Sequence, residues 1–199
     1  MARRTSRFPP TWNMSDLIEH LGRIPAQRIR VFPAPGTATE KDVIEIQARE
    51  DRLYELVDGV LVEKAKGFRE SLLAVLLIRR IGDFAERHDL GIVAGPDGTV
   101  RLARGLVRIP DCAFFDWHRL PGKMIPAEPI PDLAPDLAIE VLSESNTKGE
   151  MERKLKDYFF AGVRLVWLVD PKTRGRNRPS ATVPRRRRPH RRRGHGEDR

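Results

Sequence analysis

Two acidic residues lie on short apolar segments that are far apart in this sequence. Asp111 directly precedes an apolar run that starts at Cys112, and Glu140 stands inside the run 137–142. Burying a charged carboxylate is costly unless the group is paired or binds a metal. If the two segments are neighbouring strands, both carboxylates converge at one edge of a sheet and offer the oxygen ligands that Mg²⁺ prefers. The alternative is that Asp111 caps a turn and Glu140 points to solvent.

A lysine 14 residues after Glu140 adds a cation to this set. Lys154 lies on a predicted helix, where its ammonium could stabilise a pentavalent phosphate. Tyr158, four residues further on, would share the same helix face and orient that ammonium. The alternative is an ordinary amphipathic helix, with Leu155 and Phe159 in the core and Lys154 in solvent.

Two glutamates compete for a third acidic position. Glu55 lies on a predicted strand, where it would face away from Tyr54 and Leu56. Glu70 lies near the start of a long predicted helix. Each also has a simpler explanation, because Glu55 could be an exposed strand residue and Glu70 would interact favourably with the helix dipole.

Several other chemistries are not supported by the residue pattern. His88 and His118 are isolated, so no zinc-hydrolase pairing is present. Ser143 and Ser145 lack the glycines of a nucleophile elbow. Cys112 is the only cysteine, which excludes an internal disulfide and a structural cysteine zinc site, and we expect a buried, inert thiol.

The elements that must position these residues alternate between strands and helices. Asp58-Gly59 fits a type I′ turn and predicts a hairpin over 53–63, while apolar residues at helical spacing predict a helix over 69–88. A second hairpin is expected over 92–104, around Pro96-Asp97-Gly98. The remaining predicted elements are helices over 16–21, 42–50 and 150–160 and strands over 111–117, 137–142 and 165–169. This order predicts a single α/β or α+β domain, with one sheet flanked by helices.

The charge of the chain is concentrated at one end. The net charge is +9, but residues 172–199 hold 12 Lys and Arg against 2 Asp and Glu. The other 171 residues hold 25 basic and 26 acidic residues, so the folded body is near neutral. No apolar stretch reaches the ~20 residues of a membrane span, and no apolar segment follows the N-terminal arginines as in a secretory signal. We therefore expect a cytoplasmic protein without membrane contact.

Five short segments, taken in order, resemble the Uma2 family, which belongs to the PD-(D/E)XK (restriction-endonuclease-like) superfamily. Each is weak alone, but their order is fairly specific. The resemblance covers residues 50–171, and its segments are Tyr54-Glu55-Leu56-Val57-Asp58-Gly59, Ile109-Pro110-Asp111, Pro135 to Ser143, Arg153-Lys154 with Tyr158, and Ala161-Gly162-Val163 through Trp167 to Pro171.

The resemblance implies a restriction-endonuclease-like fold with a central mixed sheet, and hydrolysis of DNA with Mg²⁺ or Mn²⁺. Asp111 and Glu140 would ligate the metal together with the backbone carbonyl of Val141. Glu55 would be the additional acidic residue and Lys154 the catalytic lysine. Such enzymes often act in pairs, so the chain could form a homodimer.

The chain departs from the superfamily pattern at one position. A lysine is expected two residues after Glu140, but Leu142 stands there. The lysine must then come from elsewhere, with Lys154 as the first candidate and Lys148 and Lys156 behind it. The departure also favours an alternative function, a catalytically weak or inactive nuclease-fold protein that binds nucleic acid or has a regulatory role.

We expect three segments along the chain. Residues 1–49 would be an N-terminal extension with short helices, and 50–171 the nuclease-like domain. Residues 172–199 would be a disordered basic tail, because they contain many arginines and prolines and almost no large apolar residue. The tail could bind DNA phosphates, or it could be a frameshifted terminus that replaces an edge strand.

Overall fold

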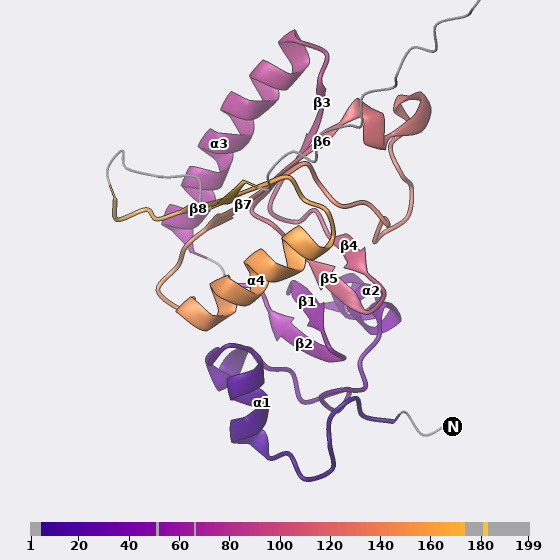
Figure 1. Cartoon of the computed structure of the whole chain (residues 1–199), viewed down its shortest axis with the longest axis vertical. Helices are drawn as coiled ribbons and strands as arrows, with labels where there is room; N and C mark the ends of the chain where they lie inside the picture. Colours follow the sequence, from indigo (N-terminus) through magenta and orange to yellow (C-terminus); the bar gives the residue numbers. More distant parts are fainter. Residues whose placement is uncertain (1–4, 51, 66, 174–180, 183–199) are drawn as a thin grey trace, which may run out of the picture.

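The structure is a computed structural model that describes residues 5–50, 52–65, 67–173 and 181–182. Its strands form two sheets, one of four strands and one of five. The chain is therefore a mixed α/β protein, and the expectation of one sheet is wrong. Figure 1 shows the smaller sheet beneath the larger one, with helices around both.

The smaller sheet consists of two antiparallel hairpins. The first joins β1 (Tyr54–Val57) to β2 (Val60–Glu63) through Asp58 and Gly59, which have φ angles of 50° and 76°. Asp and Gly tolerate this left-handed region better than most residues, which explains the turn. The second hairpin joins β4 (Val100–Ala103) to β5 (Leu106–Arg108). β1 pairs with β5, so the strand order is β2-β1-β5-β4.

The larger sheet is mixed. β7 and β8 are parallel and all other neighbouring pairs are antiparallel, in the order β3-β6-β7-β8-β9. The parallel pair requires a crossover, which a helix between the two strands provides. The strands are β3 (Gly91–Ala94), β6 (Cys112–Asp116), β7 (Leu137–Val141), β8 (Leu165–Val169) and β9 (Ala181–Thr182).

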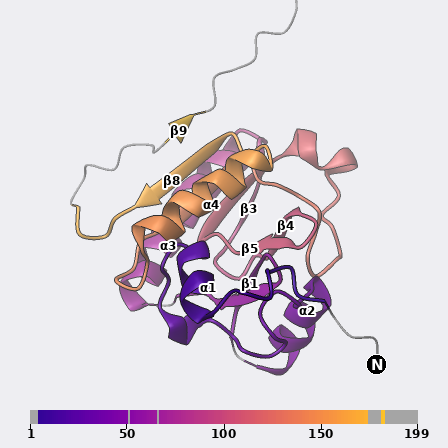
Figure 2. The same ribbon diagram turned by 60° about the horizontal axis from the view of Figure 1, so that its bottom comes forward.

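Two long helices, α3 (Phe68–Arg87) and α4 (Lys148–Phe160), cover opposite faces of the larger sheet. Ala138 of β7 belongs to the same core cluster as Tyr158 of α4, whereas the next residue, Ile139, packs with Ala74 of α3. Successive strand residues point to opposite faces, so each helix buries one side. Figure 2 shows α4 in front of the sheet and α3 behind it.

The N-terminal helices close the two faces of the smaller sheet. Leu17 of α1 (Met14–His20) packs with Val60 of β2, in a cluster that continues through a 3₁₀ turn at Ala26–Arg28. Val43 of α2 (Glu40–Arg49) packs with Leu56 of β1 in a separate cluster. Two further 3₁₀ turns, Trp117–Arg119 and Pro121–Lys123, follow β6.

Most of the predicted elements are confirmed, with ends that differ by a few residues. The strand over 165–169 and the hairpin over 53–63 lie where they were predicted. The second predicted hairpin is wrong, because β3 pairs with β6 and β4 pairs with β5, in different sheets. The turn from Gly95 to Gly98 does form, with an N···O distance of 3.0 Å, but the strands on either side of it separate.

Most of the predicted disordered tail lies outside the described residues. Ala181 and Thr182 are described, and they form β9 at the edge of the larger sheet, opposite Val166 and Leu165. Among the described residues, no helix has the length and apolar character needed to cross a membrane.

Candidate active site

Asp111 and Glu140 lie near each other where β6 begins and β7 ends, in the interior of the larger sheet. The antiparallel register pairs Cys112 with Ile139, so Asp111 directly precedes this last pair on one strand and Glu140 directly follows it on the other. Two hydrogen bonds extend the pairing. The Asp111 N–H donates to the Ile139 carbonyl at 2.9 Å, and the Val141 N–H donates to Asp111 Oδ2 at 2.7 Å. The Glu140 carboxylate meets Lys154 and Tyr158 of α4, whereas Asp111 lines a pocket whose wall includes Glu70 and Ala74 of α3.

The Lys154 ammonium lies between two buried carboxylates. Its Nζ is 3.0 Å from Glu140 Oε2 and 3.0 Å from Glu55 Oε1. Lys154 is only 3% exposed and Glu140 only 4%, so the alternatives that place them in solvent are wrong. The other lysine candidates, Lys148 and Lys156, are exposed on the same helix.

Tyr158 orients the carboxylate rather than the lysine. Its hydroxyl donates to Glu140 Oε1 at 2.6 Å, while Lys154 contacts the other oxygen of the same carboxylate. The spacing of four residues does place Tyr158 and Lys154 on one face of α4, as predicted.

Glu55 enters the site from the smaller sheet. Its carboxylate accepts from Arg108 Nη1 at 2.7 Å and from the Ile109 N–H at 3.2 Å. Arg108 ends β5, and the chain then crosses to β6 through Pro110 and Asp111. The site therefore lies where the chain passes between the sheets. Glu55 is 1% exposed, which contradicts the alternative of an exposed strand residue.

The two carboxylates that share Lys154 have opposite pKa shifts. Burial raises the pKa of Glu140, and the negative charges of Asp111 and Glu55 add to that rise, so it outweighs the opposing effect of Lys154. Burial also acts to raise the pKa of Glu55, but Lys154 and Arg108 outweigh it and lower that pKa to about 2. Burial acts to lower the pKa of Lys154, and its two carboxylate partners raise it overall. Of the two carboxylates, Glu140 thus accepts a proton more readily.

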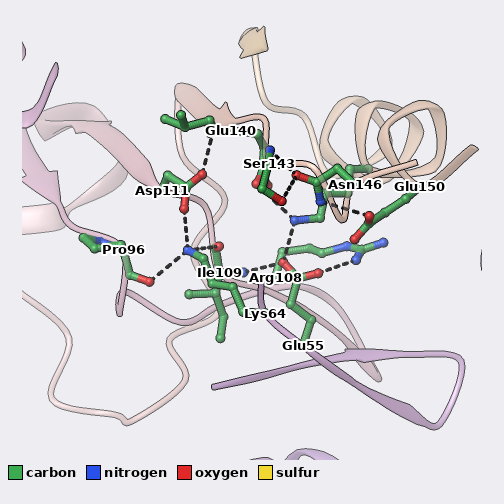
Figure 3. Close-up of polar contacts among 12 residues, drawn as sticks. Glu55, Lys64, Pro96, Arg108, Ile109, Asp111, Glu140, Ser143, Asn146 and Glu150 are labelled. Carbon is green, nitrogen blue, oxygen red and sulfur yellow. Dashed lines mark hydrogen bonds and ion pairs between the residues drawn. The ribbon is translucent and has the colours of Figure 1, made fainter. Parts of the chain in front are cut away.

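Lys64 is a second lysine in the site, and no sequence pattern pointed to it. It follows β2, and its Nζ is 2.9 Å from Asp111 Oδ1. The same ammonium donates to the carbonyls of Pro96 and Ile109 at 2.9 and 2.8 Å. Figure 3 shows Lys64 between these three partners. Residue 64 follows a strand of the smaller sheet and residue 111 precedes a strand of the larger one. Because the contact depends on how the two sheets lie in space, no local pattern could have predicted it.

Solvent reaches the site from the Asp111 side. A pocket of about 300 Å³ is lined by Lys64, Asp111, Asp97 and Glu70, among others. Glu70 also lines a larger pocket of about 810 Å³, whose wall includes the loop 142–147 between β7 and α4. Glu70 competed with Glu55 for the third acidic position. The structure places Glu55 against Lys154, whereas Glu70 lines both pockets and has no such contact with Lys154.

A second buried ion pair lies beside the site on α4. Glu150 accepts from Arg28 through both oxygens, at 2.8 and 2.9 Å, and from the Asn146 side chain at 3.0 Å. Asn146 in turn accepts from the Ser143 N–H at 2.8 Å. We call Arg28, Asn146 and Glu150 the Glu150 cluster, and Figure 3 shows Glu150 next to Asn146.

The donor atoms of the site match a hard divalent cation. Asp111 and Glu140 offer carboxylate oxygens on adjacent strands, and Val141 offers a backbone carbonyl. Across the part of the chain that the structure describes, no three acidic, His or Cys side chains are grouped as metal ligands. Mg²⁺ commonly uses only one or two protein carboxylates, with substrate and water as its other ligands. The residues present therefore fit such an ion, although a lysine is already paired with each carboxylate.

Comparison with known proteins places this fold in a recognised class. A crystal structure from Anabaena variabilis ATCC 29413, described as "a putative nuclease belonging to DUF820", matches with a TM-score of 0.55 and 19% identity. The match covers 69% of this chain and 83% of that one, and it shows a shared α/β fold. Residues 41–176 match the Uma2 family, described as "Putative restriction endonuclease", and the chain belongs to that family. A search of curated proteins gave no match.

Proposed function

We propose that this protein is an endonuclease that hydrolyses DNA phosphodiester bonds with Mg²⁺ or Mn²⁺. The observation that carries the proposal is the convergence of four ionisable residues from four elements. Glu55, Glu140 and Lys154, from β1, β7 and α4, form one buried group. Asp111, directly before β6, is partly exposed and close enough for its charge to raise the pKa of Glu140. Family membership supports the same class of reaction.

In this proposal Asp111, Glu140 and the Val141 carbonyl hold the divalent ion. When bound, such an ion supplies Lewis-acid stabilisation of the phosphate and lowers the pKa of its water ligand. Tyr158 fixes one oxygen of Glu140, and the Val141 N–H fixes one oxygen of Asp111. Lys154 carries the positive charge that stabilises the transition state. Glu55 acts through Lys154 by holding its ammonium in place.

The test is DNA cleavage by the full chain and by matched variants. Asp111→Asn and Glu140→Gln keep the shape of the side chain and remove its charge. With Mg²⁺ or Mn²⁺ and plasmid DNA, each should lower the cleavage rate by at least about a hundredfold. Glu45→Gln is the control, since Glu45 pairs with Lys41 on the exposed face of α2, away from the site. Wild-type rates in both site variants would reject the proposal.

A second candidate function is a nuclease-fold protein that binds DNA without cleaving it. Two observations favour it, the leucine at position 142 and the near-complete burial of Lys154. A mobility-shift assay alongside the cleavage assay separates the two functions. DNA binding by the wild-type chain without cleavage in either metal would favour this candidate. The expected homodimer stays a prediction, which sedimentation of the full chain would check.

A further inference from the structure

The Lys64 ammonium occupies a site built from oxygen atoms. Its three acceptors are one carboxylate oxygen, Asp111 Oδ1, and two backbone carbonyls, those of Pro96 and Ile109, all within 2.9 Å. A lysine ammonium has three N–H donors, so every donor is used. Carboxylate and carbonyl oxygens are also the ligands of hard cations. The ammonium thus holds a position that suits a cation.

We propose that Lys64 is a built-in competitor for the divalent ion at Asp111, so that residue 64 sets how tightly this site binds metal. This inference rests on the proposed function, because it takes Asp111 as a metal ligand. Metal binding then requires the ammonium to leave Asp111 Oδ1. The other oxygen, Oδ2, stays bound to the Val141 N–H.

Burial makes the competition strong. The Lys64 and Asp111 side chains are 7% and 13% exposed, and charges interact more strongly in such places than in water. Two cations that share one carboxylate oxygen would repel each other at close range. The ammonium and the metal therefore exclude each other at Asp111, and any affinity for the metal is reduced by the stability of the ion pair that it replaces.

The pocket offers the displaced ammonium other partners. Asp97 and Glu70 line the same cavity as Lys64 and Asp111. Lys64 can therefore exchange one carboxylate for another without a bare charge being left in the protein. Lys154 differs, because its ammonium pairs with both Glu140 and Glu55 and the residue is only 3% exposed. Displacing it would break two buried ion pairs, and Lys154 does not line the pocket that could accept its charge.

The experiment measures Mn²⁺ binding without DNA, by calorimetry and by electron paramagnetic resonance. Lys64→Met removes the competing charge and keeps a long apolar stem. Lys41→Met is the control, since it removes an equal charge from an exposed pair on α2. We expect Lys64→Met to bind Mn²⁺ about tenfold more tightly or better, with Lys41→Met like the wild type. Equal or weaker binding by a folded Lys64→Met protein overturns the inference.

A second variant and a wild-type measurement cover the case in which Lys64→Met does not fold. Lys64→Gln keeps donors for the carbonyls without the charge and should also tighten Mn²⁺ binding. In the wild type, acylation of lysines followed by mass spectrometry should show that Mn²⁺ increases labelling of Lys64 and leaves Lys41 unchanged. Unchanged Lys64 labelling at saturating Mn²⁺ overturns the inference.

These outcomes also separate this inference from the proposed function. If the wild type binds Mn²⁺ and cleaves DNA while the Lys64 variants bind no better, only the role of Lys64 is overturned. If neither the wild type nor the Lys64 variants bind Mn²⁺, the inference and the metal-dependent function both fail.

Discussion

The Glu150 cluster and the candidate active site are both buried groups of opposite charges against α4, but they are built differently. In the Glu150 cluster one arginine meets one glutamate through two parallel hydrogen bonds, and Asn146 supplies a third donor. In the site, the Lys154 ammonium is divided between Glu55 and Glu140, and the Glu140 pKa is raised by its burial and by neighbouring negative charge. In the Glu150 cluster each negative charge has its own cation. In the site, Glu140 shares one ammonium with Glu55, so its negative charge is only partly neutralised.

This difference shows that burial and pairing do not by themselves identify a functional residue. Glu150 and Glu140 are each 4% exposed, so exposure does not separate them. What separates them is their partners. Glu140 feels the negative charge of Asp111, which lines a pocket, while Glu150 is held by a cation that joins the N-terminal segment to α4. In a structural ion pair, each charge is neutralised by its partner. In a functional site, one charge is only partly neutralised, and a ligand of opposite charge can bind to it.

The largest expected effect is on the stability of the Glu150 cluster. Arg28→Met leaves Glu150 buried without its cation, and breaking a buried ion pair in this way costs about 3–5 kcal/mol. Urea unfolding of the two proteins would measure the loss. The double variant Arg28→Met with Glu150→Met should recover much of it, since no charge is then left buried. A single variant as stable as the wild type would contradict the structural role of this pair.

A smaller loss is expected when Glu140 loses its hydroxyl donor. Tyr158→Phe removes the 2.6 Å hydrogen bond to Glu140 Oε1 and changes little else in the core. Hydrogen bonds to charged groups contribute about 1.5–3 kcal/mol, so urea unfolding should show a loss in that range. The same variant should slow cleavage, because one oxygen of Glu140 is no longer held. Unchanged stability together with unchanged cleavage would remove Tyr158 from the site.

Glu140→Gln should cost less stability than Glu150→Gln. Burial already disfavours the Glu140 charge, and Lys154 keeps Glu55 at 3.0 Å when that charge is removed. We expect a loss smaller than the about 3–5 kcal/mol of a broken buried ion pair, measured by urea unfolding beside Glu150→Gln. If Glu140→Gln lost as much stability as Glu150→Gln, the Glu140 charge would be neutralised in the site as fully as the Glu150 charge is in its cluster.

The smallest effect concerns a half-exposed pairing at the turn of the first hairpin. Burial acts to raise the pKa of Asp58, but its hydrogen bonds with His20 and Arg153 lower it overall from 3.8. Because the folded pKa is lowered, the stability that Asp58 contributes is present above pH 3.8 and is lost as the pH falls through the folded value. Asp58→Asn suits the turn and should lower the melting temperature slightly near neutral pH. That difference should shrink below pH 3.8, and a difference independent of pH would contradict this origin.

Sequence patterns were sufficient where the determinants are local. The Asp58-Gly59 turn, the apolar face of α3 and the apolar strand over 165–169 each depend on a few neighbouring residues. The positions of Asp111 and Glu140 also follow once β6 and β7 are taken as neighbours.

Long-range pairing is where sequence patterns were insufficient. The Pro96-Asp97-Gly98 segment has the composition of a hairpin turn, but packing separates the strands beside it into two sheets. The contact of Lys64 with Asp111 depends on that same arrangement of the sheets. A single sequence contains no signal for the separation of these strands or for this contact. Both depend on which distant segments lie side by side, and the order of segments along the chain does not determine that.

The close contact between Gly22 and Gly149 limits how this chain can be shortened. A Cβ on Gly22 would lie 2.4 Å from the Gly149 carbonyl carbon, and the Thr147 hydroxyl donates to the Gly22 carbonyl at 2.5 Å. The family match begins at residue 41. The segment before it thus packs against, and is hydrogen-bonded to, the start of the helix that carries Lys154. A protein trimmed to residues 41–176 would lose both the contact of Gly22 with the start of α4 and the Arg28 cation that pairs with Glu150. Expression trials should therefore retain the N-terminal residues, even though the family match omits them.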